Sequence, residues 1–307
     1  MQTIYYRSIR QAYIGQIDDI KRGSWLHVVN PTGEELDELA QRFSFDADLL
    51  NDGIDLYESP RLEHEDGVTY LYIRYSWPES LETSTQPLLI IATSENLVTV
   101  SRRSPEPIEH LVSLGEVVTT QKVKLILQIL NQVNNGYRRD LNQITKQIYA
   151  SRSRLQRKIV SDDDIIRFID LEEDLNEFLT ALQPYGLLLR ALASGRYVNF
   201  HEDDLNLIED IELSTNELID LSKNRLKTIQ NMREAYATIA ANNLNRIFKR
   251  LTSITIFLAV PTVIGGLFGM NVPVPLHDTP YAFWIVCVLI AALVAGTVAY
   301  FKRRRWL

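Results

Sequence analysis

Two long apolar runs near the C-terminus dominate the pattern of hydrophobic and polar positions. The first run, residues 251–268, interrupts its apolar side chains only with hydroxyl groups and glycines, and the second, residues 281–301, carries no charge. A helix of about 20 apolar residues crosses the roughly 30 Å hydrocarbon core of a bilayer. The pattern therefore predicts two transmembrane helices, at about 251–270 and 281–301, joined by an external loop at 271–280.

Basic residues flank both runs. They are Arg246, Lys249 and Arg250 before the first run, and Lys302, Arg303, Arg304 and Arg305 after the second. Clusters of lysine and arginine stay on the cytoplasmic side of a membrane. Both termini are therefore predicted to be cytoplasmic, with residues 302–307 as a basic cytosolic tail. Residues 1–10 contain no apolar core of a signal sequence. The lack of a presequence, together with the lack of disulfides, favours a prokaryotic inner membrane over a mitochondrial one.

A stretch without glycine or proline, residues 196–260, leads directly into the first apolar run. If residues 201–270 form one helix, that helix is about 100 Å long, because each residue adds about 1.5 Å. So long a helix is not expected in a single globular domain. It is expected in a symmetric bundle of helices around an axis. We therefore predict a stalk helix that continues into the first transmembrane helix. Heptad spacing alone leaves four, five or six helices open.

One face of the predicted rod repeats at alternating intervals of three and four residues. In the membrane portion its side chains are small or carry hydroxyl groups. The face consists of Glu234, Thr238, Ala241, Asn245, Phe248, Thr252, Thr255, Ala259, Thr262, Gly266 and Gly269. Polar residues are costly in lipid, so we expect this face to line a bundle interior or a water-filled path. Close helix packing through small residues would produce the same pattern without a pore.

The N-terminal part, residues 1–118, is predicted to be an α/β domain. Thr32 and Glu35 form a capping-box pattern that begins a helix ending near Phe43. Residues 46–56 are expected to form another short helix. The β-branched and aromatic content predicts strands at 69–75, 88–92 and 97–101.

Residues 119–200 are predicted to form an antiparallel helical hairpin. Between residues 137 and 183 the chain contains no glycine or proline, and the turn is expected at residues 161–164. Ser161 would cap the second helix, and the three aspartates that follow would lie at the positive end of its dipole.

Four segments of the sequence resemble the CorA family of divalent-cation channels. They are Phe268-Gly269-Met270-Asn271, Tyr300–Leu307, Trp25–Glu35 and Glu95–Val100. The Gly-Met-Asn tripeptide is a strong signal because it lies at the outer end of the penultimate span. The resemblance covers nearly the whole chain. It implies an α+β protein in which a cytosolic α/β domain precedes a long helical stalk and two C-terminal transmembrane helices, assembled as a homopentameric funnel in membrane lipid.

The resemblance also implies a path for hydrated Mg²⁺, an ion that gives up its water reluctantly and prefers oxygen ligands. Gly269, Met270 and Asn271 would form the selectivity filter, where five Asn271 amides accept hydrogen bonds from the ion's water. Asn245 would form a second polar ring, and Phe248 with Leu251 a hydrophobic gate. The full pore lining and gate are expected at Asn245, Phe248, Leu251, Thr252, Thr255, Ala259 and Thr262. The membrane potential would drive entry without ATP.

Regulation by cytosolic Mg²⁺ between subunits is a further implication of the resemblance. Counted back from the Gly-Met-Asn motif without gaps, Asp210 corresponds to the family's principal sensing aspartate. Glu234 corresponds to an acidic ring in the inner pore. The partner of Asp210 is expected in the α/β domain near Glu79 or Glu82. Loss of the bound cation would splay the stalk and open the gate. The alternative for Asp210 is an ordinary solvated carboxylate.

Composition narrows the classes of partner and of chemistry. The net charge of −7 and the pI near 5.4 argue against nucleic acid and favour cations as ligands. The single cysteine, Cys287, lies in the second apolar run, which excludes an intrachain disulfide and a cysteine-based zinc site. The five histidines show no ligand spacing, and no Ser-His-Asp or His-Glu-x-x-His arrangement occurs. An enzyme is therefore not expected.

Two alternatives to Mg²⁺ transport stay open. The loop after the Gly-Met-Asn motif contains one acid, Asp278, and one histidine, His277, whereas many magnesium-transporting members carry several acids there. Transport of Zn²⁺, or of Co²⁺ or Ni²⁺, within the same superfamily is therefore the first alternative. The second is a regulatory module that the helical hairpin only tethers to the membrane. The polar side chains of Thr252, Thr255 and Asn271 argue against it.

Overall fold

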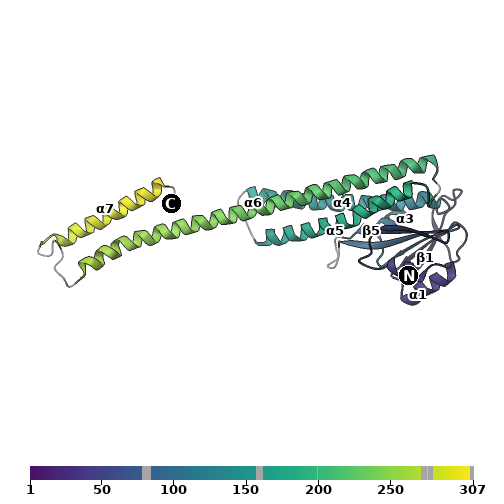
Figure 1. Ribbon diagram of the computed structural model, residues 1–307, viewed down its shortest axis with the longest axis horizontal. Helices are drawn as coiled ribbons and strands as arrows, with labels where there is room; N and C mark the ends of the chain where they lie inside the picture. The colour runs from purple at the N-terminus through teal and green to yellow at the C-terminus, as the bar shows by residue number, and fades with distance from the viewer. Residues whose placement is uncertain (78–83, 157–161, 199, 271–274, 276–278, 305–307) are drawn as a thin grey trace. The chain divides into compact units, whose positions relative to one another are not determined.

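The computed structural model describes the whole chain except residues 78–83, 157–161, 199, 271–274, 276–278 and 305–307. The chain divides into two compact units, Met1–Met232 and Arg233–Leu307. The boundary lies inside the longest helix, α6 (Glu202–Phe268), so that α6 contributes to both units (Figure 1).

Unit 1 contains a seven-stranded sheet in the order β2-β1-β3-β7-β6-β5-β4. Its strands are β1 (Gln2–Tyr6), β2 (Gly15–Gln16), β3 (Trp25–Val29), β4 (Arg61–Glu65), β5 (Val68–Ser76), β6 (Thr85–Ala92) and β7 (Leu97–Ser101). Neighbouring strands are antiparallel apart from β3 and β7, which run parallel. The strands expected at 69–75 and 97–101 are confirmed.

The strand expected at 88–92 begins earlier than predicted, at Thr85. Thr85 to Pro87 pair with β5, where Pro87 lies opposite Arg74. The pairing of β6 with β7 starts only at Leu88. Pro87 therefore costs no hydrogen bond to β7, although proline usually interrupts a central strand. The four strands β1 to β4 and helix α3 (Glu106–Leu114) were not predicted from the residue pattern.

Helices cover both faces of the sheet (Figure 1). Successive side chains of a strand point to opposite faces. On β5, Tyr72 points to the face that carries α1 (Gly33–Phe43) and α2 (Ala47–Asp52), and its hydroxyl donates to Leu49 O at 2.8 Å. The opposite face packs against α4 (Lys122–Gln156), where the Tyr137 hydroxyl donates to Arg74 O at 3.1 Å.

The capping box of α1 is confirmed. The Glu35 amide donates to Thr32 Oγ1 at 3.3 Å, and the Thr32 amide donates to Glu35 Oε2 at 2.9 Å. Helix α2 is shorter than the predicted helix at 46–56, because it ends at Asp52 and Gly53 follows. A Cβ atom on Gly53 would lie 2.5 Å from Leu89 Cδ2. The sheet therefore approaches the backbone at this point, which explains the glycine.

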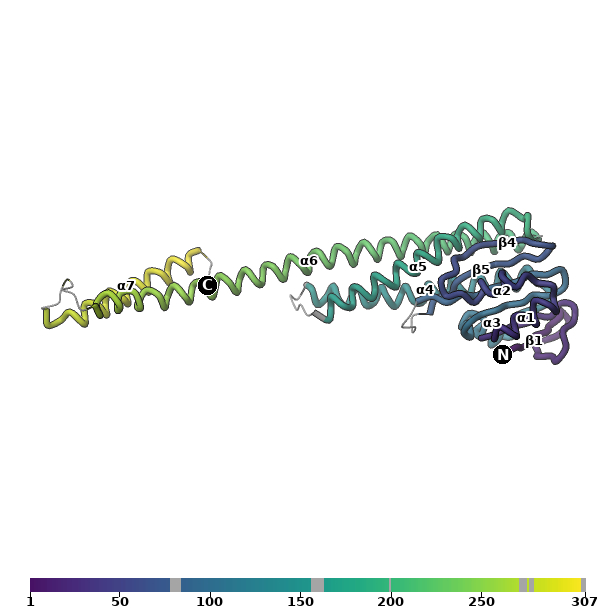
Figure 2. Tube along the Cα trace, turned by 60° about the horizontal axis from the view of Figure 1, so that its bottom comes forward, coloured from purple at the N-terminus to yellow at the C-terminus, as the bar shows by residue number. Residues whose placement is uncertain are grey.

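The helical hairpin consists of α4 (Lys122–Gln156) and α5 (Asp162–Ala193), and both lie along the N-terminal part of α6 (Figure 2). Ser161, the predicted cap, lies outside the described residues. Pro184 lies within α5, since burial of neighbours such as Tyr185 outweighs the lost backbone hydrogen bond. The Asn134 side chain on α4 donates to Thr215 Oγ1 at 2.9 Å and to Ile211 O at 3.0 Å, which fixes α4 against α6.

His27 is a buried titratable group of unit 1. It is 6 % exposed on β3, and Thr99 Oγ1 lies 2.9 Å from its Nδ1. Because Trp25 Nε1 donates to the same hydroxyl oxygen, the Thr99 O–H is free to donate to a neutral imidazole. Burial, and then the positive N-terminus, lower the pKa of His27 from 6.5 to about 4.

We expect unit 1 to lose stability as the pH falls from 6.5 towards 4. In this window the unfolded chain binds a proton that the folded chain does not bind. The free energy of unfolding therefore falls, by up to about 3 kcal/mol. Tryptophan fluorescence during thermal unfolding at several pH values measures the effect. The variant His27→Gln should flatten the dependence on pH in this window. An equal slope in the variant would contradict the assignment to His27.

Candidate functional site: the polar face of helix α6

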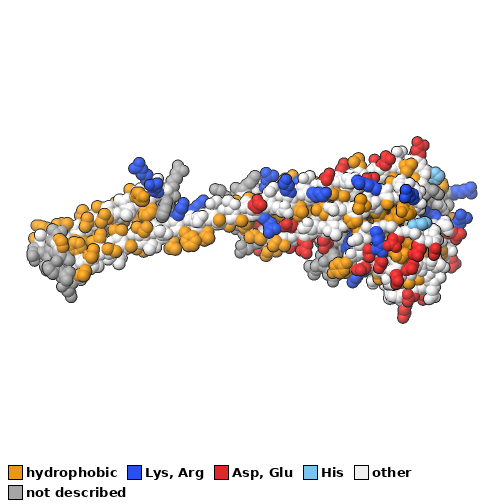
Figure 3. Space-filling model, viewed as in Figure 1, with side chains coloured by type: hydrophobic (Ala, Val, Ile, Leu, Met, Phe, Trp, Pro, Cys, Tyr) orange, Lys and Arg blue, Asp and Glu red, His pale blue; other side chains and the backbone are white. Residues whose placement is uncertain are grey.

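Unit 2 consists of the C-terminal half of α6 and of α7 (Ala282–Arg303). Both helices contain windows long and apolar enough to cross a membrane. Hydrophobic side chains are spread over much of the visible face of this unit (Figure 3). The two helices contact each other through Phe257 and Phe301, whose ring centroids are 5.7 Å apart. Ser253 is fully buried, and its hydroxyl donates to Lys249 O at 2.8 Å.

The predicted pore face lies elsewhere on α6. We call it the α6 stripe. All its members are exposed in the single chain: Glu234, Thr238, Ala241, Asn245, Phe248, Leu251, Thr252, Thr255, Ala259, Thr262, Gly266 and Gly269. Phe248 and Leu251 are 56 % and 58 % exposed, although both are large and apolar. Because α7 leaves the α6 stripe uncovered, the stripe is available to water or to another chain.

The threonine hydroxyls of the α6 stripe bond within the helix. Thr255 donates to Leu251 O at 2.9 Å, and Thr262 donates to Leu258 O at 2.8 Å. Thr238 makes the same contact with Glu234 O at 3.0 Å. These bonds satisfy each O–H without a partner outside the helix, and the oxygen lone pairs remain able to accept from water. The geometry suits both predicted roles, pore lining and close packing.

Helix α6 ends one residue before the Gly-Met-Asn motif, at Phe268. The Gly269 amide still donates to Gly265 O at 2.9 Å. A Cβ atom at position 269 would lie 3.1 Å from the same oxygen, which is tighter than ordinary contact. Glycine therefore suits the end of this helix. Met270 is 54 % exposed. Asn271, His277 and Asp278 lie outside the described residues.

The predicted regulatory carboxylates lie on α6. Asp210 is exposed, between the buried side chains of Ile208 and Ile211, and no ion pair or hydrogen bond joins its side chain to another described residue. Glu234 is exposed as well. The described residues contain no group of three or more histidine, cysteine or acidic side chains that could hold a metal ion. Glu79 and Glu82, the predicted partners of Asp210, lie outside them.

A model of the CorA-like Mg²⁺ transporter protein family matches residues 21–303. The chain belongs to that family. Membership makes the protein a membrane transporter of divalent cations, and it agrees with the two apolar C-terminal helices. The resemblance inferred from the sequence is thus confirmed.

Relatives and solved structures match over most of the chain. The cobalt/magnesium transport protein CorA of Methanocaldococcus jannaschii is 27 % identical over 296 residues, which cover 92 % of this chain and 91 % of that protein. The complete structure of the CorA magnesium transporter from M. jannaschii covers 100 % of this chain and 99 % of its own, with a TM-score of 0.85 and 24 % identity. The divalent cation transporter CmaX of Pseudomonas aeruginosa is 31 % identical over 130 residues, which are 41 % of this chain and 38 % of CmaX. The predicted fold, with its α/β domain, long helix and two apolar helices, is confirmed.

Proposed function

We propose that this CorA-family transporter conducts hydrated Mg²⁺ into the cell through a homopentameric pore, driven by the membrane potential. The uncovered α6 stripe is the observation that carries the proposal. Its small and hydroxylated residues lie within a helix apolar enough to span a bilayer, and its large members, Phe248 and Leu251, are exposed in the single chain. Hydroxylated residues in a membrane helix are stable when they face a bundle interior or water, and small residues let neighbouring helices pack closely.

Five α6 helices around an axis would place equivalent residues in rings. Rings of Thr252, Thr255 and Thr262 supply hydroxyl oxygens, and Ala259 keeps the path wide. Phe248 and Leu251 narrow it as a gate that closes by excluding water. Asn245 adds a polar ring on the inner side. Gly269, Met270 and Asn271 form the selectivity filter at the outer mouth, where neutral oxygens accept hydrogen bonds from the waters of Mg²⁺.

The proposed topology places both termini in the cytoplasm and the loop 271–280 outside, in the inner membrane. The α/β domain (1–118), the hairpin (119–200) and the stalk part of 201–270 are then cytosolic, and the helix 281–301 returns to the basic tail 302–307. The arginines and lysines before the first span and after the second span support this orientation, because such clusters stay on the cytoplasmic side. In this proposal the gate is regulated by cytosolic Mg²⁺ that binds near Asp210. Glu234 in the inner pore also contributes to this regulation.

Cysteine labelling tests the pore face. In a Cys287→Ser background, Thr255→Cys is expected to react with a membrane-impermeant cationic thiol reagent and to lose most Mg²⁺ flux as a result. Ile256→Cys is the matched control, because the next residue of a helix points about 100° away. It should keep its flux. Equal block of both variants, or block of Ile256→Cys alone, would contradict the assigned face.

The second candidate is transport of another divalent ion. The loop 271–280 contains only one acid, Asp278, so little negative charge gathers at the mouth. The M. jannaschii relative is described as a cobalt/magnesium transporter. Co²⁺, Ni²⁺ or Zn²⁺ would then be the main substrate of the same path. Competition of each ion with Mg²⁺ influx distinguishes these possibilities, and the absence of any flux would favour a tethered regulatory module.

A further inference from the structure

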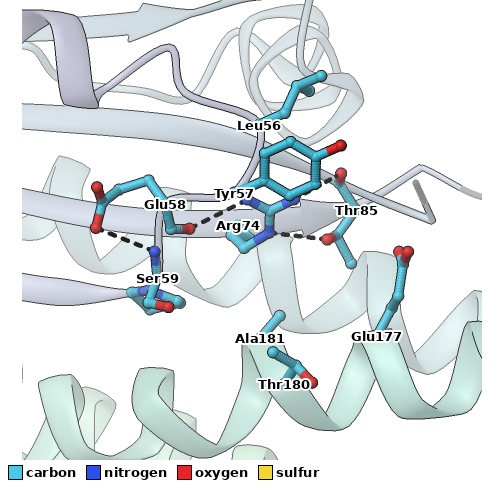
Figure 4. Close-up of a pocket in the computed structure, with 10 residues that line it drawn as sticks. Leu56, Tyr57, Glu58, Ser59, Arg74, Thr85, Glu177, Thr180 and Ala181 are labelled. Carbon is cyan, nitrogen blue, oxygen red and sulfur yellow. Dashed lines mark hydrogen bonds between the residues drawn. The ribbon is translucent and has the colours of Figure 1, made fainter. Parts of the chain in front are cut away.

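A pocket of about 150 Å³ lies in unit 1, between the sheet and α5 (Figure 4). Among the charged groups that line this pocket are the guanidinium of Arg74 on β5 and the carboxylate of Glu177 on α5. Leu56, Pro60 and Ala181 supply apolar wall. Neither the cation path nor the regulatory carboxylates involve these residues. We call this space the Arg74 pocket.

Arg74 is a buried cation without a paired anion among the described residues. It is 9 % exposed, and no described carboxylate lies within ion-pair distance. Its Nε donates to Thr85 Oγ1 at 2.8 Å, Nη2 to Thr85 O at 3.0 Å and Nη1 to Glu58 O at 3.1 Å. A guanidinium has five N–H groups. One N–H on each terminal nitrogen therefore has no partner among the described residues, and burial lowers the pKa of Arg74.

Two N–H groups on the terminal nitrogens of a guanidinium can bind the two oxygens of a carboxylate as a fork. The charges of Glu177, Asp55 and Glu58 act on Arg74 without a direct ion pair. A buried guanidinium that lines a pocket and has no direct ion pair favours an anionic group there. This observation identifies one end of the ligand.

Glu177 defines the opposite end. Its Oε2 accepts a hydrogen bond from the Ser84 amide, and its Oε1 has no hydrogen-bond partner among the described residues. Glu177 also lines the pocket. Figure 4 shows Glu177 rising from α5 towards the space beside Arg74 and Thr85. Burial raises the pKa of Glu177, so a cationic neighbour would stabilise its charged form. A simple anion would be repelled by this carboxylate, whereas a molecule with an ammonium group would not.

The size of the pocket limits the ligand. A cavity of about 150 Å³ accepts a molecule as large as benzene, which has six heavy atoms. Alanine has six, glycine five and serine seven. The wall formed by Leu56, Pro60 and Ala181 suits a hydrogen or a methyl group. Tyr57 also lines the pocket and is 83 % exposed, so it lies at the surface of the protein.

We propose that the Arg74 pocket binds a small α-amino acid as its zwitterion, with the carboxylate on Arg74 and the ammonium group on Glu177. The bound molecule would join β5 to α5, because its carboxylate contacts Arg74 on β5 and its ammonium group contacts Glu177 on α5. The ligand therefore links the α/β domain to the helical hairpin. The proposal is independent of cation flux, since binding is measured without transport.

Equilibrium dialysis of the full-length protein in detergent with radiolabelled L-alanine tests the proposal. We expect saturable binding, competition by glycine and L-serine, and much weaker competition by propionate, which lacks the ammonium group. Glu177→Gln should weaken L-alanine binding by about tenfold or more, as expected for a lost charge-assisted hydrogen bond. Propionate competing as well as glycine would overturn the zwitterion assignment.

Plugging the pocket provides a test that leaves its charged groups in place. Thr180 lines the pocket and is exposed on α5, so Thr180→Phe should fill the space while the protein stays folded. Asn176, one helical turn earlier, is exposed and does not line the pocket, which makes Asn176→Phe the matched control. Circular dichroism confirms folding of both. Binding lost in Thr180→Phe and kept in Asn176→Phe supports the site. Equal binding in both variants, or no saturable binding to wild type, would overturn it.

Discussion

Replacing Asn271 with alanine is expected to abolish potential-driven Mg²⁺ uptake. In a pentamer the substitution removes five amide oxygens at once from the proposed outer mouth. Each hydrogen bond that such an oxygen accepts from the ion's water contributes about 1 kcal/mol net. Five of them amount to about 5 kcal/mol, so the rate of entry should fall about a thousandfold or more.

The measurement is Mg²⁺ uptake into liposomes that contain the purified protein and a Mg²⁺-sensitive dye. Asn242→Ala is the matched control, because Asn242 is exposed on α6 and does not belong to the α6 stripe. It should transport at nearly the wild-type rate, and both variants should elute as the same oligomer. Uptake by Asn271→Ala at the wild-type rate would exclude Asn271 as the filter.

Replacing Asp210 with lysine is expected to remove inhibition by internal Mg²⁺. In the proposed mechanism, a cation between subunits neutralises Asp210 and carboxylates of a neighbouring chain, which holds the stalks together and closes the gate. The side chain is exposed and has no partner among the described residues of its own chain, so it is free for such a contact. A lysine ammonium repels the cation. Coupling between sites is typically worth 1 to 3 kcal/mol, so half-inhibition should shift by about tenfold or more.

Uptake into liposomes loaded with increasing Mg²⁺ measures this shift. Glu209→Lys makes the same change of charge at the adjacent exposed position, about 100° around the helix. We expect Glu209→Lys to retain inhibition. If both variants lose inhibition equally, the effect is one of overall charge, and if Asp210→Lys is inhibited like wild type, Asp210 does not sense the cation.

Local signals made much of the fold predictable. The capping box at Thr32 and Glu35 concerns four consecutive residues, and the structure contains both of its hydrogen bonds. The absence of glycine and proline between residues 196 and 260 is also a local signal. It predicted a long helix, and the structure contains α6, which extends over 67 residues. Long, strongly periodic helices also leave a clear face, which is how the α6 stripe was found.

Contacts between distant segments were not predictable in the same way. The early start of β6 at Thr85 depends on pairing with β5, and Pro87 is tolerated only because β7 does not reach it. The Arg74 pocket joins β5, the segment before β4 and α5, and no sequence motif marks it. A search for cationic residues within buried strands would have drawn attention to Arg74. The partners of Asp210 belong to another subunit in our proposal, which a single chain does not show.

The most direct test of the account is Mg²⁺ entry into liposomes under an imposed inside-negative potential. Two charges that cross about 100 mV gain roughly 4.6 kcal/mol, equivalent to about three powers of ten in concentration. We predict that Mg²⁺ accumulates when the potential is present and stops when it is collapsed, without a proton gradient. Zn²⁺ entry that follows a proton gradient, with no response of Mg²⁺ to the potential, would contradict the account.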